Sequence, residues 1–119
     1  DRILDICGTH LAPNGVAYVS YNVLPGWYLR LAIRDLMLFH AGPITDREKR
    51  TAQARAICAF YQKATRRSLR PAHKAMTEQL EFVLSFPDWY LSHDVLEPVN
   101  EPLYFADFVR SAEAHGLQY

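Results

Sequence analysis

The chain has 119 residues, of which half are hydrophobic and 22% are charged, and its 13 basic and 13 acidic residues cancel. This length allows one hydrophobic core and excludes two ordinary domains, while the composition excludes a disordered chain. Zero net charge gives no general attraction to nucleic acid or to an anionic membrane surface, so we expect neither as a partner.

The two cysteines, Cys7 and Cys58, indicate a reducing compartment. Two isolated thiols without a secretory leader are typical of small apolar side chains in a cytoplasmic protein, and we expect that location. Because the chain begins with Asp1 and not with Met, we also expect it to be a piece of a longer protein.

The first 27 residues predict a helix, a turn and a strand. Apolar residues at helical spacing predict a helix over 2–11, and a Pro-Asn-Gly turn follows it. Residues 16–21 are rich in β-branched and aromatic side chains, which predicts a strand that ends at a Pro-Gly-Trp corner. A helix, a turn and an apolar strand in this order are typical of an α/β unit.

Helices are expected over most of the remaining chain. Apolar residues surround almost all of 28–41, which predicts a helix that is buried on most sides or lies in an interface, with Arg34 and Asp35 on its narrow polar strip. Thr45 and Glu48 form a capping box that opens a helix reaching about residue 67. The expected inner face of that helix consists of Ala52, Ala56, Ala59, Phe60 and Ala64, widened by Ile57 and Tyr61.

Two more helices and a helical turn follow. Pro71 suits the first turn of a helix that carries apolar residues at helical spacing to Leu84 and is ended by Phe86-Pro87, and residues 89–96 predict a short helical turn. Asn100 is placed to cap the last helix and Gly116 to end it. The predicted fold is therefore mainly α. A helical domain over 25–119, a bundle of about four helices, follows an N-terminal helix–strand piece over 1–24.

No motif for catalysis or metal binding stands out. No two of the five histidines have the paired spacing of a zinc site, and only His93 and Glu97, four residues apart, could share a helix face. The serines lack the glycines of a nucleophile elbow, and no basic motif adjoins either cysteine. We therefore expect no catalytic, metal-binding or cofactor-binding residue in this chain.

Two charged clusters are typical of solvated surface. Glu78 and Glu81 lie three residues apart on a predicted helix. A basic tract at the junction of two helices could meet phosphate, but it contains no interleaved aromatic residue, and a solvated turn with favourable cations at a helix C-terminus is the commoner explanation. This tract consists of Lys63, Arg66, Arg67, Arg70, His73 and Lys74.

The corner over residues 20–27 leaves two interpretations open. It is either the end of a strand packed by an indole, or a pocket wall at the carboxyl end of a strand, where open α/β sheets bind ligands. The residue types alone favour neither interpretation.

Separated motifs occur in a fixed order along nearly the whole chain. They are AYVSYN at 17–22, LPGW at 24–27, RDLM at 34–37, YLSHDVLE at 90–97, NEPLYF at 100–105, FV at 108–109 and GLQY at 116–119. Together they resemble the predicted methyltransferase regulatory domain of bacterial S-adenosylmethionine-dependent (class I) methyltransferases.

The resemblance implies that a catalytic methyltransferase domain precedes the helical domain, and that residues 2–21 match a late helix and strand of its Rossmann-like sheet. Asn14 would then replace the first glycine of a Leu-x-Pro-Gly-Gly-like turn, which it can do because Asn tolerates positive φ. The glycine-rich loop that binds S-adenosylmethionine would lie upstream, so the cofactor is expected in the parent enzyme and not here. Related multidomain enzymes methylate lysines on proteins, which implies a possible protein substrate for the parent.

We therefore predict a non-catalytic domain that regulates the parent methyltransferase, or positions its substrate, by packing against the catalytic domain of the same chain. The alternative is a helical protein–protein interaction or dimerisation module without a regulatory role, so a homodimer is also possible. The predicted interdomain or functional-surface residues are Tyr21, Asn22, Trp27, Arg34, Asp35, His93 and Glu97.

Overall fold

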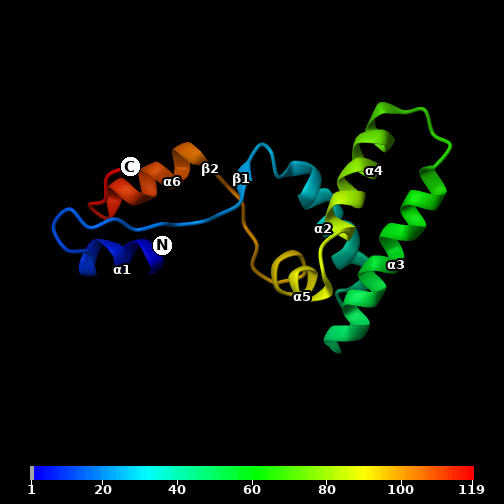
Figure 1. The fold of residues 1–119 in the computed structure, drawn as a ribbon, viewed down its shortest axis with the longest axis horizontal. Coiled ribbons are helices and arrows are strands. Elements are labelled where there is room, and N and C mark those ends of the chain that lie inside the picture. Colours follow the sequence, from blue (N-terminus) through cyan, green and yellow to red (C-terminus); the bar gives the residue numbers. More distant parts are fainter. Residues whose placement is uncertain (1) are drawn as a thin grey trace. The chain divides into compact units, whose positions relative to one another are not determined.

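A computed structural model describes residues 2–119, and these form two compact units. Unit 1 contains the chain up to Trp27 together with Glu101–Tyr119, and unit 2 is the continuous segment Tyr28–Asn100. Unit 1 holds α1 (Arg2–His10), β1 (Val23–Leu24), β2 (Leu103–Tyr104) and α6 (Phe105–Ala114) (Figure 1). Unit 2 holds α2 (Tyr28–Ala41), α3 (Arg47–Thr65), α4 (Pro71–Leu84), α5 (Asp88–Tyr90) and the π-helix η1 (Leu91–Val95). The predicted mainly helical fold is confirmed.

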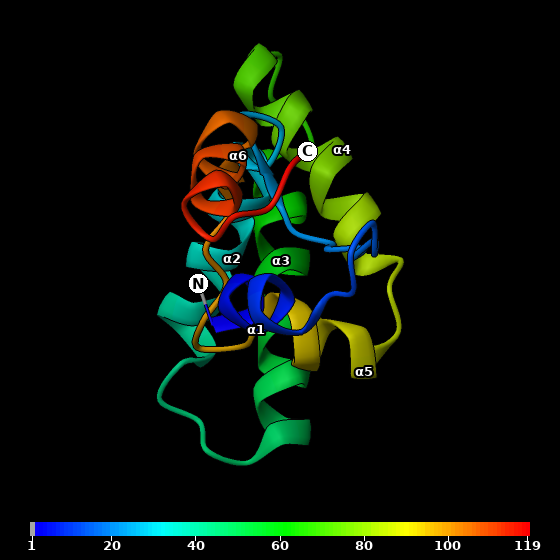
Figure 2. The same ribbon diagram turned by 90° about the vertical axis from the view of Figure 1, so that its left-hand side faces the viewer.

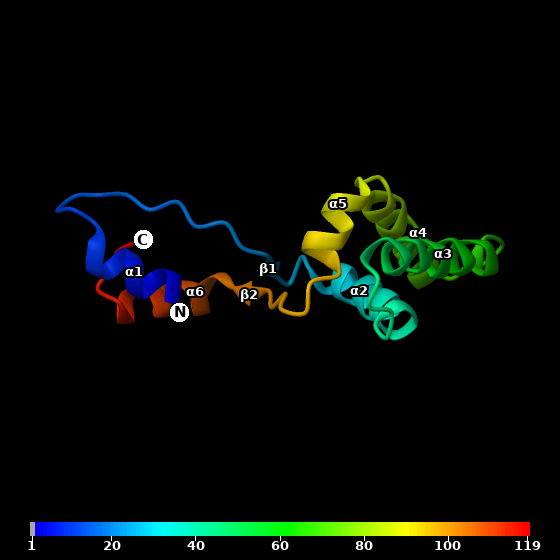
Figure 3. The same ribbon diagram turned by 90° about the horizontal axis from the view of Figure 1, so that it is seen from below.

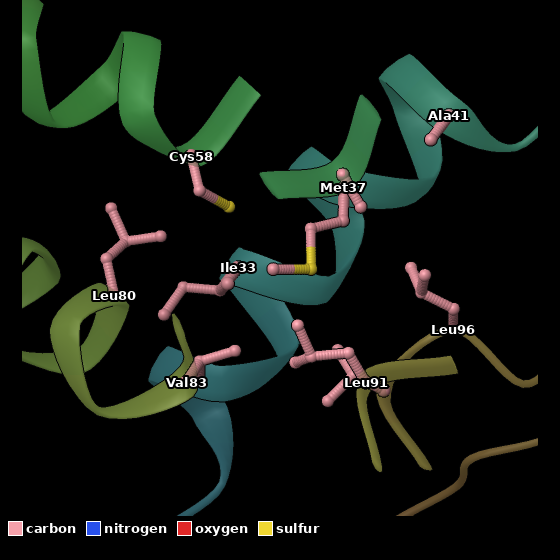
Figure 4. Packing of buried hydrophobic residues seen from close by; sticks show 10 residues of the cluster. Ile33, Met37, Ala41, Cys58, Leu80, Val83, Leu91 and Leu96 are labelled. Carbon is pink, nitrogen blue, oxygen red and sulfur yellow. The ribbon is translucent and has the colours of Figure 1, made fainter. Parts of the chain in front are cut away.

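The main hydrophobic core belongs to unit 2 and lies between α2, α3, α4 and η1 (Figure 4). Ile33 and Met37 of α2 are completely buried at its centre, and burial of each such side chain stabilises the fold by about 1.5–3 kcal/mol. The core consists of Ile33, Met37, Ala41, Ala54, Cys58, Leu80, Val83, Leu91, Val95 and Leu96.

Helix α2 has the bounds that the sequence predicts, and α4 begins at Pro71 as predicted and ends at Leu84, just before the predicted stop at Phe86-Pro87. Pro71 occupies the first turn of α4, where its missing N–H costs no helical hydrogen bond. Helices α3 and α4 lie side by side and are joined by a short connection (Figures 1 and 2). The burial of α2 does not follow the polarity of its side chains: Arg34 of the predicted polar strip is buried, whereas the apolar Phe39 is 89% exposed.

The predicted start of α3 is wrong, and its predicted inner face is right only at Ile57 and Tyr61, which pack against the core. Asp46, not Thr45, is the N-cap, because its carboxylate accepts the Lys49 N–H at 2.8 Å. Its buried residues are Thr51, Ala54 and Cys58, while the predicted alanines and Phe60 are exposed. Ile57 and Tyr61 lie four residues apart and share one helix face with Ala54 and Cys58, and α3 packs this face against α2 and α4.

The two strands of unit 1 pair in parallel, with Val23 opposite Leu103 and Leu24 opposite Tyr104. The Asn22 carbonyl accepts the Leu103 N–H at 2.9 Å and extends this pairing by one bond. Helices α1 and α6 are neighbours in the same unit (Figure 3). Unit 1 is therefore held together by contacts between its N-terminal and C-terminal segments: β1 pairs with β2, and α1 packs beside the end of α6.

Residues 16–21 do not form the predicted strand and run to β1 without regular secondary structure (Figure 3). Val16 is 90% and Tyr18 is 93% exposed. A strand requires a hydrogen-bonded neighbour, and no other segment of residues 2–119 pairs with this one. High β-propensity alone does not supply that neighbour.

Turn and cap residues behave as expected at two positions. Asn14 has φ of +65°, which supports its place in a glycine-type turn, and Gly116 has φ of +74° just after α6. Asn100 does not cap α6: its side chain donates to the Asp94 carbonyl at 2.9 Å, and Tyr104 is the N-cap residue. In the part of the chain that the structure describes, no helix is long and apolar enough to cross a membrane.

Candidate functional site

The corner residues of unit 1 surround the β1–β2 pair. The Tyr21 ring stacks on Phe108 of α6, with ring centroids 4.3 Å apart and planes inclined by 23°. The Asn22 carbonyl bonds to β2, and the Trp27 N–H donates to the Val23 carbonyl at 3.2 Å. Tyr21, Asn22 and Trp27, three of the predicted interdomain or functional-surface residues, thus lie just before and just after β1.

A groove of about 850 Å³ lies beside this corner, between α1, residues 11–23, α6 and the C-terminal tail. Its lining contains Tyr18, Tyr21, Phe105, Phe108 and Tyr119, but no Asp, Glu, Lys, Arg or His side chain. The groove is therefore aromatic and uncharged.

This lining does not suit S-adenosylmethionine. The methionine part of that cofactor carries an ammonium, a carboxylate and a sulfonium group, which need charged partners or the amides of a glycine-rich turn. Neither is present in the groove of unit 1. The predicted absence of cofactor-binding residues from this chain stays a prediction that a titration can test.

Three of the predicted surface residues meet in unit 2. Arg34 of α2 is only 8% exposed, and its guanidinium donates to the carbonyls of Glu97 and, at 3.3 Å, Pro98. The Glu97 carboxylate lies 3.8 Å from the His93 ring nitrogen Nδ1, across one turn at the end of η1. Asp35, next to Arg34 in the sequence, is exposed and does not join this cluster.

Two arginines of α3 bind the backbone of the segment 84–98, which runs from the end of α4 through η1 and also contains the carbonyls that Arg34 binds. Arg50 donates to the Leu96 carbonyl at 2.6 Å, and Arg55 donates to the carbonyls of Leu84 at 2.8 Å and Phe86 at 2.6 Å. Backbone carbonyls at and just after helix ends lack helical partners, so these guanidinium groups satisfy partly buried acceptors there. The sequence gives no signal for this role, because carbonyl acceptors are not specific to any residue type.

The segment that the arginines hold contains the π-helix η1. Such turns are rare and occur frequently at functional sites. Immediately before it, burial and a hydrogen bond to Asp94 raise the pKa of Tyr90 above its usual value. The π-helix, the His93–Glu97 pair and Arg34 thus form one polar cluster on unit 2.

A charged groove of about 550 Å³ lies between the end of α3 and the start of α4. It brings together members of the basic tract and the two carboxylates that the sequence marks separately: Lys63, Arg66, His73 and Lys74 line it with Glu78 and Glu81. We call it the α3–α4 groove. Among residues 2–119, no three His, Cys, Asp or Glu side chains gather to hold a metal ion.

Comparisons with known proteins agree with the sequence motifs. The family model of the predicted methyltransferase regulatory domain matches residues 87–119, which confirms the resemblance. Two uncharacterised proteins of Rickettsia prowazekii (strain Madrid E), RP789 and RP028, are 38% and 30% identical over 119 and 113 residues. The chain spans only 22% and 45% of their lengths.

Solved structures of PKMT2 from Rickettsia typhi share the fold. One matches with a TM-score of 0.79 and 31% identity over 96% of the chain, which corresponds to 21% of PKMT2. A second, with a TM-score of 0.77, is PKMT2 in complex with AdoHcy. The chain is thus similar to one part of longer proteins.

Proposed function

We propose that this chain, whose residues 87–119 match the predicted methyltransferase regulatory domain, is the non-catalytic regulatory or substrate-positioning part of an S-adenosylmethionine-dependent methyltransferase. The observation that carries this proposal is the fold match to one fifth of PKMT2, a protein that binds AdoHcy. AdoHcy is what S-adenosylmethionine becomes when it gives up its methyl group. The donor site of the parent enzyme would lie outside these residues, and a cytoplasmic location remains part of the proposal, in keeping with the free thiols of Cys7 and Cys58.

The mechanism we propose is mechanical. The chain passes between its two units twice, after Trp27 and before Glu101, and both passages lie within four residues of the β1–β2 pair. This pair ties the two connections together, so a displacement of unit 2 would be transmitted through it to unit 1. In the parent enzyme such a displacement would open or close the mouth of the active site, as hinged elements do in other enzymes.

The joint is tested by Trp27→Ala in the longer protein. The substitution keeps the backbone bond to Val23 and removes the half-buried indole, which loosens the corner. We expect kcat to fall by about tenfold, because small misplacements of substrate-positioning elements are costly, while the affinity for S-adenosylmethionine stays unchanged. Trp89→Ala is the matched control, since Trp89 is 66% exposed and lies in unit 2. Unchanged turnover in Trp27→Ala, or equal losses in both variants, would refute the joint.

The non-catalytic assignment is tested by titrating the 119-residue chain with labelled S-adenosylmethionine. We expect no saturable binding. Saturable binding by this chain alone, or methyl transfer by it, contradicts the proposal.

A second candidate function, protein–protein interaction or dimerisation, is favoured by the exposed aromatic side chains Phe39 and Phe60, which are 89% and 67% exposed. Light scattering separates the two candidates. A stable dimer of both the chain and the longer protein favours assembly. A dimer of the chain alone indicates pairing through the open backbone of residues 16–21.

A further inference from the structure

We propose that the α3–α4 groove binds an acidic segment of a protein partner. The inference rests on the proposed function in one respect, namely that this partner is a protein presented to the methyltransferase. The binding itself depends only on residues of unit 2.

The first argument is an unpaired excess of positive charge. Lys63, Arg66 and Lys74 line the groove, and Arg67 and Arg70 lie in the connection between α3 and α4. In the part of the chain that the structure describes, none of these five side chains forms an ion pair within 4 Å. Because the chain has zero net charge, this concentration of cations leaves the rest of the chain acidic. An acidic ligand would therefore be drawn to this end of unit 2.

The second argument is the polar lining. The Ser68 hydroxyl lies 2.7 Å from the His73 ring nitrogen Nδ1, and the His73 ring stands edge-on to Tyr61 with centroids 6.3 Å apart. These contacts fix the position of His73 at the wall of the groove. Leu69 at the rim is 99% exposed and offers an apolar contact next to the cations. A volume of about 550 Å³ suits a few side chains of an extended segment.

A polypeptide fits this groove better than a nucleic acid. No Phe, Tyr or Trp side chain lines it, whereas single-stranded nucleic acid is held by stacking on such rings. Glu78 and Glu81 share the groove and would repel a continuous phosphate backbone. A polypeptide can place carboxylates on the cations and a basic or neutral residue beside these two glutamates.

The test measures fluorescence anisotropy of a capped, fluorescein-labelled peptide of alternating Glu and Ser in the presence of the 119-residue chain. A peptide with Gln in place of every Glu is the ligand control. The groove variant is Arg66→Gln with Lys74→Gln. The matched control is Arg2→Gln with Lys49→Gln, which removes the same charge from exposed positions outside the groove. Circular dichroism verifies that both variants keep the helical content.

We expect the Glu peptide to bind more tightly than the Gln peptide, and added salt to weaken it. The groove variant should weaken binding by about fivefold, the sum of two exposed charge pairs, and the control by less than about twofold. Equal binding of the two peptides, equal losses in the two variants, or tighter binding of a single-stranded oligonucleotide would overturn the inference. None of these outcomes bears on Trp27→Ala in the longer protein, so failure of the groove and failure of the proposed function are distinguishable.

Discussion

At the scale of single residues, three arginines of unit 2 direct their guanidinium groups mainly at backbone carbonyls. Arg34 has no carboxylate partner among the described residues, and its Nε atom, like that of Arg50, is buried without a hydrogen-bond partner. Both carbonyl contacts of Arg34 come from its Nη2 group. A guanidinium is more weakly hydrated than an ammonium, so burying it costs less than burying a lysine. Arg34 is therefore a structural contact between α2 and the chain after η1.

We expect Arg34→Ala to lower the free energy of unfolding by about 2 kcal/mol, because two carbonyls lose their donor and a cavity remains. Asp35→Ala, an exposed change one residue away, should alter it by less than about 0.5 kcal/mol. Urea unfolding followed by circular dichroism gives both values. We expect Arg34→Lys to be less stable than the wild-type chain, and equal stability would show that the guanidinium is not required at this position.

Burial raises the pKa of the Cys58 thiol from 9.0 to about 11, against the smaller opposing effect of Arg55. The unfolded thiol ionises from pH 9 upward while the folded one stays protonated, so stability should decline between pH 9 and 11. We expect this single group to contribute about 2 kcal/mol to that decline. Under reducing conditions, urea unfolding of Cys58→Ala should show a lower stability at pH 8 but a shallower decline above pH 9. An identical pH slope in both proteins would contradict the assignment.

At the scale of elements, a close contact between α1 and the end of α6 determines what residue 8 can be. A Cβ atom on Gly8 would lie 2.4 Å from the His115 carbonyl oxygen, which is backbone and cannot move aside easily. We expect Gly8→Ala to destabilise unit 1 by about 1–3 kcal/mol, although alanine favours helices. Gly26→Ala is the control, because the nearest atom to its Cβ would lie at 3.7 Å. Urea unfolding followed by tryptophan fluorescence compares the two; equal stabilities would show that the helices can separate without cost.

Local signals predicted the elements whose shape depends on nearby residues. Helices α2 and α4 were predictable because proline and glycine mark where they begin or end and because their apolar residues recur at helical spacing. The positive φ of Asn14 follows from its place in a Pro-Asn-Gly turn. The errors concern long-range partners. Residues 16–21 lack a neighbouring strand in the described chain, and the inner face of α3 is chosen by α2 and α4.

The same distinction holds for the site. Spacing along one turn indicated that His93 and Glu97 could share a helix face, and the His93 ring nitrogen Nδ1 lies 3.8 Å from the Glu97 carboxylate. The contact of Arg34 with the Glu97 carbonyl joins residues 63 positions apart, and no spacing reveals it. The α3–α4 groove forms because a helical hairpin folds the basic tract back beside Glu78 and Glu81.

At the scale of the whole molecule, the core is distributed unequally. Every residue of the main hydrophobic cluster lies between Ile33 and Leu96, within unit 2. We therefore expect the isolated segment 28–100 to unfold cooperatively with helical circular dichroism. The segment 1–27 should remain unfolded until the peptide 101–119 is added, because its β1 and α1 need β2 and α6. An unfolded 28–100 segment would mean that this cluster is insufficient without unit 1.

The pairing of Val23 with Leu103 also sets an order of events during synthesis. On the ribosome, β1 has no partner strand until about eighty further residues have been translated. The intervening helices carry their own apolar centre and can collapse meanwhile. Unit 2 can therefore fold before unit 1 closes, and Tyr18 and its neighbours are accessible to chaperones throughout that interval.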